Sequence, residues 1–176
     1  MHTCYLQLGS NLGNKAFQLQ SACAMISSQA GIISKYSSIY VTDPWGFTTK
    51  NLFFNQVVEV RTNLSAHNLL STLLNIEHSL GRTRKNTNGY SSRIIDLDIL
   101  FYEDMVINTP DLILPHPLLH KRRFVLEPLN EIAPDLLHPI LGKTIHELTF
   151  ACQDHLKVQV LSNDYLNISL RSNETV

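Results

Sequence analysis

The sequence has little that would mark a membrane protein, a secreted protein or a zinc protein. Its three cysteines, Cys4, Cys23 and Cys152, are widely spaced and form no C-x-x-C pair, which argues against a disulfide framework or a zinc site. No apolar run approaches the length that crosses a bilayer, and no signal-peptide pattern opens the chain. The formal net charge is −1, so bulk charge favours neither a nucleic acid nor a membrane partner. We therefore expect a cytoplasmic protein.

The common glycine-rich phosphate loops are also missing. Residues 9–14, G-S-N-L-G-N, lie between a predicted strand and a predicted helix, where such a loop would belong. They match neither G-x-x-x-x-G-K-[ST] nor G-x-G-x-x-G. We interpret this segment as a structural turn.

The chain of 176 residues is long enough for one domain with its own core, which we place at 1–161 with a polar tail at 162–176. Alternating or β-branched segments predict strands at 3–8, 32–42, 53–62, 94–102 and 158–161. Residues 103–104 should turn into a hairpin strand at 105–107. Helical periodicity and capping signals predict helices at 12–26, 66–80, 124–132 and 145–152. The order favours an α+β sandwich, a mostly antiparallel sheet with helices packed on both faces.

The most informative segment is the predicted strand I-I-D-L-D-I-L-F-Y, because it carries two aspartates among apolar residues. Strands disfavour Asp, and a buried unpaired carboxylate is costly. Asp96 and Asp98 should share one face, about 7 Å apart at Cα. The other face is predicted to carry Ile95, Leu97, Ile99 and Phe101. Two adjacent carboxylates are typical of a site that holds Mg²⁺ together with substrate phosphates.

Basic residues gather near this strand. Half of the fourteen lie in two short segments, made of Arg82, Arg84, Lys85, Arg93, Lys121, Arg122 and Arg123. Local positive charge in a nearly neutral chain indicates a small anionic ligand. Three alternatives stay open at this point: a solvent-facing strand with ordinary surface charges, another Mg²⁺-dependent D-x-D nucleotide transferase, or a non-catalytic effector-binding module. An RNA-binding module is disfavoured, because the basic residues lie in loops.

From residue 5 to residue 138 the chain resembles the 6-hydroxymethyl-7,8-dihydropterin pyrophosphokinases of folate biosynthesis. The resemblance rests on six segments in order: L-G-S-N-L-G, T-D-P-W-G, F-F-N, G-R-T-R, R-I-I-D-L-D-I-L, and L-P-H-P-L-L-H-K-R-R-F-V-L-E-P-L-N-E-I-A-P. It implies a ferredoxin-like sandwich. It also implies transfer of pyrophosphate from ATP to the pterin hydroxymethyl group, with AMP and the pterin diphosphate as products.

The resemblance also implies roles for particular residues. Asp96 and Asp98 would hold two Mg²⁺ ions, and Arg82 and Arg93 would act with them in catalysis. The ATP site would comprise Leu70, Arg84, Arg93, Ile99, His116 and Arg122, with backbone groups near Leu112 and Ile113 reading the adenine. Arginine suits phosphate because its planar fork binds bidentately and stays charged.

The pterin site implied by the resemblance is built around two aromatic rings, Phe53 and Phe124, which would sandwich the heterocycle while Asn55 reads its amide edge. The full set is Thr42, Asp43, Trp45, Phe53, Asn55, Tyr90, Asp96 and Phe124. We expect only these small molecules as partners, no nucleic acid or membrane, and a monomer.

Three departures from the family pattern concern affinity and loop closure rather than reaction class. Leu74 stands where a glutamine is common, and Ser91-Ser92 replaces a Gly-Pro pair before Arg93. The segment 86–89 leads to Tyr90, where the family often places an aromatic residue.

Overall fold

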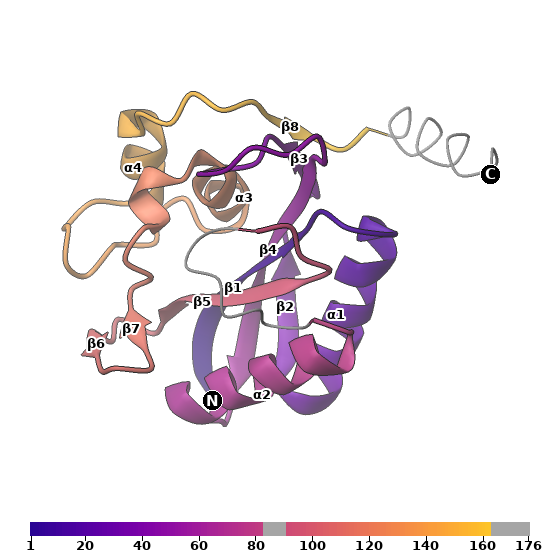
Figure 1. The fold of residues 1–176 in the computed structure, drawn as a ribbon. Helices are drawn as coiled ribbons and strands as arrows, with labels where there is room; N and C mark the ends of the chain where they lie inside the picture. Colours follow the sequence, from indigo (N-terminus) through magenta and orange to yellow (C-terminus); the bar gives the residue numbers. More distant parts are fainter. Residues whose placement is uncertain (83–90, 163–176) are drawn as a thin grey trace.

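The computed structural model describes residues 1–82 and 91–162, which form an antiparallel sheet between two layers of helices (Figure 1). The strands of the main sheet are β1 (His2–Ser10), β2 (Ile32–Tyr36), β3 (Tyr40–Thr42), β4 (Phe53–Thr62), β5 (Asp96–Tyr102) and β8 (Val158–Val160). The helices are α1 (Lys15–Gln29), α2 (Ala66–Ser79), α3 (Arg123–Ile132) and α4 (Ile145–Ala151). None of the helices in the described part of the chain is long and apolar enough to span a bilayer.

The strand order is β5-β1-β4-β3-β8, and β2 also pairs with β4. Each pairing among these strands is antiparallel. This arrangement confirms the predicted α+β class and the mostly antiparallel sheet. The two central strands, β1 and β4, are mostly buried along their length because helices cover the sheet on both sides.

One face of the sheet packs against α1 and α2. Alternate residues of β1, such as Leu6 and Leu8, point into this core. They meet the buried stripes of the two helices, which are Leu19, Ala22 and Ile26 on α1 and Leu69, Leu73 and Ile76 on α2. This apolar layer is the larger of the two cores and supplies most of the hydrophobic stabilisation.

The opposite face packs against α3 and α4 over only part of its area. Tyr5, Val57 and Phe101 from the sheet contact Val125, Leu126 and Leu129 from α3 and Ile145 and Leu148 from α4. This smaller core ends about halfway along β1, and the remaining half of the face is polar.

Capping signals in the sequence place the helix ends. Asn14, Ser65 and Thr144 each accept a hydrogen bond from the backbone of the first turn of α1, α2 and α4, and Thr144 forms a reciprocal capping box with Glu147. Gly31 ends the α1 region with φ of 155°, and a Cβ there would lie 2.2 Å from the carbonyl oxygen of Arg61. Only glycine fits this close approach.

Three expectations about the strands are wrong. The predicted strand 32–42 is two strands, β2 and β3, because the chain bends after Tyr36 and pairs with two separate stretches of β4. Residues 105–107 do not form a hairpin with the aspartate strand; β6 (Ile107–Asn108) pairs with β7 (Ile113–Leu114) in a small separate sheet.

The third error concerns Phe101, which does not share a face with Ile99. The pairing of β1 with β5 shifts by one residue, so that Tyr5 lies opposite Phe101 while Leu6 lies opposite Ile99. Leu100 is the extra residue of this bulge, and its carbonyl oxygen accepts from His116 N. Leu100 and Phe101 both pack in the α3 core, whereas Leu97 and Ile99 pack in the α1–α2 core.

Candidate active site

The polar half of the α3 face forms the floor of a cavity of about 300 Å³. The strand register builds this floor in two rows across three strands. Asp96 lies opposite Gly9, which lies opposite Asn55, and Asp98 lies opposite Gln7. Because neighbouring strands are about 4.8 Å apart, Asp96 and Asn55 stand about 10 Å from each other at Cα, on opposite sides of β1.

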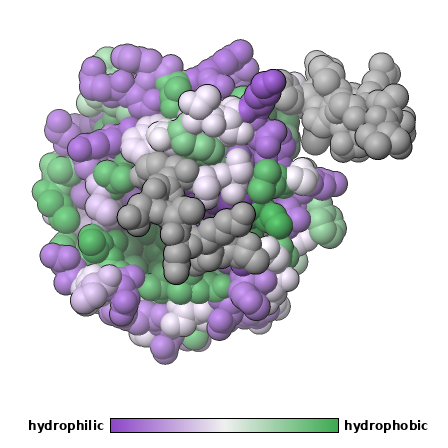
Figure 2. All heavy atoms as spheres, in the orientation of Figure 1, coloured by the Kyte–Doolittle hydropathy of each residue, from purple (hydrophilic) through white to green (hydrophobic). Residues whose placement is uncertain are grey.

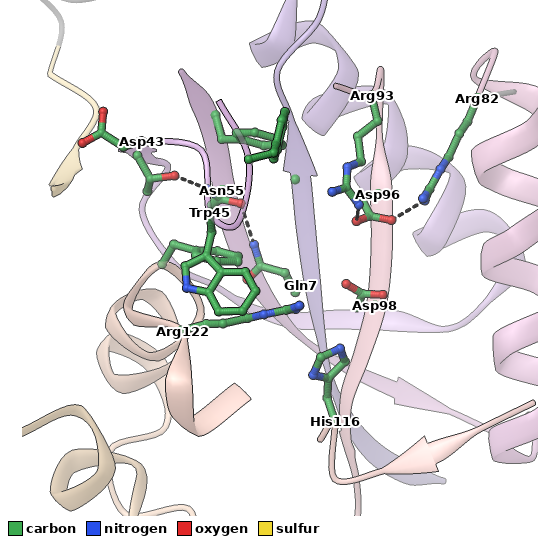
Figure 3. A pocket seen from close by; sticks show the side chains of 15 residues that line it. Gln7, Asp43, Trp45, Asn55, Arg82, Arg93, Asp96, Asp98, His116 and Arg122 are labelled. Carbon is green, nitrogen blue, oxygen red and sulfur yellow. Dashed lines mark hydrogen bonds and ion pairs between the residues drawn. The ribbon is translucent and has the colours of Figure 1, made fainter. Parts of the chain in front are cut away.

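The walls of the cavity come from segments that leave the sheet. Its lining consists of Gln7, Gly9, Thr42, Asp43, Trp45, Phe47, Phe53, Asn55, Arg82, Arg93, Asp96, Asp98, His116, Arg122 and Phe124. Figure 3 shows the aspartates projecting from β5 on one side and Asn55, Trp45 and Arg122 grouped on the other. Seen from outside, this side of the molecule is hydrophilic over much of its rim, with hydrophobic residues gathered below the centre (Figure 2).

Two arginines meet the first aspartate. Arg82 and Arg93 each form an ion pair with Asp96, one with each carboxylate oxygen (Figure 3). Arg82 also pairs with Glu77, a buried carboxylate on α2. Burial alone would lower the pKa of Arg82, but the carboxylates of Asp96 and Glu77 raise it above its usual value. The Arg82 guanidinium therefore stays positively charged between these two carboxylates.

Asp98 is electrostatically different from Asp96. Burial raises its pKa to about 7, and the Asp96 carboxylate adds to this rise, while Arg122 and Arg93 oppose it. The ionised form of Asp98 is thus poorly compensated by the cations of the described residues. A carboxylate in this condition favours an added positive charge beside it.

The two aspartates fit a magnesium ion that also binds phosphate. They provide hard oxygen ligands on one face of one strand, as the sequence predicted, and the undercompensated charge of Asp98 is directed into the cavity. Among the described residues there is no group of three or more His, Cys, Asp or Glu side chains suited to a metal. Mg²⁺ commonly takes only one or two protein carboxylates and completes its shell with water and phosphate.

A cationic and aromatic wall faces the aspartates. The guanidinium of Arg122, a buried residue that precedes α3, lies 4.8 Å from the centre of the Trp45 ring and 5.8 Å from that of Phe124. The neighbouring Arg123 turns elsewhere, to Glu127 and to the backbone oxygens of Cys152 and Asp154. Of these adjacent arginines, only Arg122 contributes to the cavity.

His116 is held as a neutral ring. Burial lowers its pKa to about 4, and the charge of Arg122 acts in the same direction. Its Nδ1 accepts from Leu118 N at 3.2 Å, which leaves the proton on Nε2. His116 can therefore donate a hydrogen bond into the cavity without adding charge.

The opposite end of the cavity is suited to a flat polar ring. Phe53 contacts Phe47 edge to face, with ring centres 6.1 Å apart, and the Arg93 guanidinium lies 5.9 Å from the Phe53 ring. Asn55 is buried between two polar neighbours: its Nδ2 donates to Thr42 Oγ1 at 2.8 Å, and its Oδ1 accepts from Gln7 Nε2 at 2.9 Å. Aromatic faces beside fixed amide groups are typical of a heterocycle site.

A buried asparagine outside the cavity holds Arg93 in place. Asn11 exchanges two hydrogen bonds with Arg93, from Asn11 N to Arg93 O at 3.1 Å and from Arg93 N to Asn11 Oδ1 at 2.7 Å. Its Nδ2 donates to Ser92 Oγ at 2.9 Å. Asn11, in the segment 9–14 that we interpreted as a structural turn, thus anchors the backbone of Arg93. Ser92, one of the departures from the family pattern, supplies one of its anchors.

Most of the predicted site residues lie together around this cavity. Leu70 and Ile99 do not line it: Ile99 is buried in the α1–α2 core, and Leu70 is half-buried against that core. The predictions for Arg84 and Tyr90 lie outside the described residues.

Sequence reasoning missed Gln7, Gly9, Phe47 and Glu77. A signal existed for Gln7, since it alternates with Leu6 and Leu8 and so had to face the other side of the sheet. Glu77 interrupts the apolar stripe of α2, and its Oε1 accepts from Leu97 N at 2.8 Å as well as from Arg82. No pattern in the sequence singles out Phe47.

Comparisons with known proteins agree with this geometry. The family model described as 7,8-dihydro-6-hydroxymethylpterin-pyrophosphokinase (HPPK) matches residues 5–134. A 2-amino-4-hydroxy-6-hydroxymethyldihydropteridine pyrophosphokinase of Methylorubrum extorquens is 43% identical over 84% of this chain and 91% of its own length. The namesake protein of Bacillus subtilis is 43% identical over 73% of this chain and 76% of its own length.

Longer proteins share the same region. The folic acid synthesis protein fol1 of Pneumocystis carinii is 39% identical over 94% of this chain, which spans 22% of that protein. A crystal structure of Plasmodium falciparum HPPK-DHPS superposes with a TM-score of 0.72 at 19% identity, covering 85% of this chain and 45% of the other. This chain thus spans less than half of that solved chain, and the likeness concerns the fold. From the family match and the bacterial relatives together, the chain belongs to the 7,8-dihydro-6-hydroxymethylpterin pyrophosphokinase family.

Proposed function

We propose that this chain transfers the β,γ-pyrophosphoryl group of ATP to the hydroxymethyl oxygen of 6-hydroxymethyl-7,8-dihydropterin, a step of folate biosynthesis. The observation that carries the proposal is the composition of the one cavity floor. Asp96 and Asp98 stand on one side of β1 and the amide of Asn55 stands on the other. The proposed phosphate site and the proposed heterocycle site therefore share one cavity.

The reaction follows from this juxtaposition. The hydroxymethyl oxygen attacks the β-phosphorus in line, and the bond from that phosphorus to the oxygen bridging it to the α-phosphate breaks, which releases AMP. Holding both substrates against one floor converts a bimolecular encounter into an intramolecular one. The separation of about 10 Å between Asn55 and Asp96 at Cα would accommodate a bicyclic ring with a one-carbon arm.

We assign the handling of phosphate charge to the arginines. Arg93, tied to the β1 turn through Asn11, is fixed and would hold the triphosphate. Arg82 lies three residues after the end of α2 and would reach the transferring group. His116 and Arg122 would contact the nucleotide from the opposite wall, and Arg84, Leu70 and Ile99 remain proposed members of the ATP site.

The pterin would lie at the Asn55 end. Phe53 and Phe124 would contact its faces, with Trp45 beside Arg122 at the cavity wall. Asn55 would read the amide edge, and Thr42 and Asp43 would supply neighbouring hydrogen bonds. Tyr90 remains a proposed contact from the family pattern.

Asp96 and Asp98 would hold Mg²⁺, and we propose two ions. Bound there, magnesium would neutralise phosphate charge and lower the pKa of the attacking hydroxyl. Asp96 would have to exchange its arginine partners for the ion. The guanidinium groups of Arg82 and Arg93, which pair with Asp96 in this structure, would then be available to bind the phosphates.

The finer descriptions of the protein are also proposals. The interleaving of β1, α1, β4, α2 and β5 supports a ferredoxin-like sandwich. We further propose a single domain over 1–161, a monomer and a cytoplasmic location, which sedimentation and cell fractionation would test.

Product analysis tests the proposed reaction. Protein, ATP, Mg²⁺ and 6-hydroxymethyl-7,8-dihydropterin are incubated, and the nucleotides are resolved by chromatography. We expect AMP and pterin diphosphate in equal amounts, both lost in Asp96→Ala and Asp98→Ala. Release of ADP or of free pyrophosphate would instead identify a different phosphoryl or nucleotidyl transfer and overturn the proposal.

A further inference from the structure

We propose that Gln7 is a positioning residue that sets the orientation of the Asn55 amide and thereby the selectivity of the site for a lactam edge. This inference rests on the proposed function, because it concerns how the same cavity distinguishes its heterocyclic substrate from close analogues. Gln7 lies on the strand between the aspartates and Asn55, opposite Asp98 (Figure 3).

The buried Gln7 side chain lowers the stability of the fold, which indicates a role other than stability. Its side chain is 5% exposed, yet its Oε1 has no hydrogen-bond partner among the described residues. A buried polar atom without a partner destabilises a protein, and an apolar residue of the same size would avoid the cost. On the opposite face of the same strand, the neighbouring positions are the apolar residues Leu6 and Leu8.

The Gln7 amide has only one orientation that satisfies its neighbours. Its nitrogen lies 3.1 Å from the backbone oxygen of Leu8, which can only accept a hydrogen bond. The atom in that position must therefore be the donor Nε2 and not the oxygen. The same nitrogen lies 2.9 Å from the Asn55 side chain, so the Asn55 atom facing it must be the acceptor Oδ1.

The orientation of the Gln7 amide determines the orientation of the Asn55 amide. With Oδ1 turned to Gln7, Nδ2 points to Thr42 Oγ1 at 2.8 Å. The Thr42 hydroxyl could either donate or accept, so it cannot choose the orientation by itself. The Leu8 carbonyl thus fixes the orientation of the Gln7 amide, and the Gln7 amide in turn fixes that of Asn55.

Gly9 leaves room for this arrangement. It lies opposite Asn55 in the strand register, and a Cβ at Gly9 would lie 3.1 Å from Asn55 Oδ1. That distance is tighter than ordinary carbon–oxygen contact, so a larger residue would push the Asn55 oxygen from its place beside Gln7.

A fixed Asn55 can distinguish two edges of similar shape. A lactam edge carries an N–H donor beside a C=O acceptor, and an oriented carboxamide offers the complementary acceptor and donor in one order only. An analogue with an amino group in place of the lactam oxygen presents the reverse order. A site with a fixed hydrogen-bond pattern rejects such an analogue because its buried polar groups are then opposed or unpaired.

The test compares two ligands across matched variants. The ligands are 6-hydroxymethyl-7,8-dihydropterin and its 2,4-diamino counterpart, and dissociation constants are measured by calorimetry alongside that of ATP. Gln7→Met keeps the size and removes the amide, and Gln7→Glu keeps the shape and replaces the donor nitrogen with an acceptor. Gln56→Met is the control, because Gln56 follows Asn55 on β4, faces the other side and donates to Ser37 O at 2.8 Å.

We expect the wild-type protein to prefer the lactam. We expect Gln7→Met to reduce that preference by about tenfold, the value of one hydrogen bond. Gln7→Glu should reduce it further, since the carboxylate and Asn55 Oδ1 repel and favour the flipped amide. ATP affinity should stay within about twofold in Gln7→Met, and Gln56→Met should leave the preference unchanged.

Equal weakening of both ligands, or an unchanged ratio in a folded Gln7→Met, would overturn the inference. Gln7→Met buries no new polar group, so it should fold even if Gln7→Glu does not, and its melting temperature verifies this. Failure of the proposed function can be distinguished from failure of the Gln7 inference. Wild-type protein that binds neither ligand and forms no AMP would overturn both the proposed function and the role of Gln7. Wild-type protein that forms AMP with a ratio insensitive to Gln7 overturns only the role of Gln7.

Discussion

The two faces of the central sheet differ in what they contain. The face under α1 and α2 is a continuous apolar layer in which residues such as Leu6, Leu73 and Ile76 are fully buried. The face under α3 is apolar for half its area. The other half carries two neighbouring aspartates, half-buried arginine ion pairs, and an amide oxygen, Gln7 Oε1, that has no partner among the described residues. One set of strands thus provides stability on one side and chemistry on the other, at some cost in stability.

The largest effect is expected from Asp98→Asn on turnover. Removal of one charge that organises the phosphate site should lower kcat by at least about 10³-fold, the scale found for groups that stabilise transition-state charge. Steady-state AMP formation measures it. A loss below tenfold would show that Asp98 does not hold a magnesium ion needed for the reaction.

Leu73→Ala, on the other face, should lower stability and leave turnover unchanged. Its side chain is completely buried in the α1–α2 layer, and the change should cost about 2–5 kcal/mol of unfolding free energy. The kcat of the remaining folded enzyme should be unchanged within about twofold. Urea denaturation and active-site titration measure the two quantities, and a large fall in kcat per folded molecule would contradict the division of the faces.

Glu77→Gln addresses a link between the two faces. Glu77 belongs to α2, but it binds Arg82 and the backbone of β5 at Leu97. Glutamine can still accept from Leu97 N and loses only the charge that holds Arg82, so we expect turnover to fall about 10–100-fold with little change in stability. Glu77→Ala, which leaves Leu97 N without its partner, should lower both. Identical stability losses in the two variants would show that Glu77 is purely structural.

Parts of this arrangement were predictable from the sequence. The aspartate strand, the caps at Ser65 and Thr144 and the α3 helix follow from periodicity and local hydrogen bonding, which a single segment encodes. The bulge at Leu100 does not, because it depends on how β1 and β5 pair across about ninety residues of sequence. The pairing of β6 with β7 was missed for a similar reason: a short strand can join whichever edge tertiary packing presents.

The residues of the candidate site likewise divide into those that the sequence predicted and those that it did not. The charged residues were predicted because they are unusual in their local context, as Asp96 and Asp98 are in a strand. Gln7 and Glu77 were missed because each occupies an ordinary position in a regular element. Their significance appears only when another element brings Asn55 or Arg82 against them.

The smallest effect is expected from pH acting on His116. Its pKa falls from an ordinary 6.5 to about 4 on folding, since burial and the Arg122 charge disfavour the protonated ring. Its contribution to stability is therefore complete above pH 6.5 and is lost as pH falls from 6.5 through 4. Unfolding free energies of wild type and His116→Asn at pH 7 and pH 4.5 should show a smaller acid loss in the variant. Parallel losses would contradict a neutral buried His116.

The most direct test of the account is the unfolding free energy of Asp98→Asn, measured on the preparation whose turnover is tested. Burial and the Asp96 carboxylate raise the pKa of Asp98 to about 7, so its ionised form opposes folding above that pH. We predict that at pH 8 without Mg²⁺ the variant is at least as stable as the wild type while its turnover is lost. A variant that is less stable by about 2 kcal/mol or more, the scale of a core substitution, would show that this face serves the fold and not the reaction.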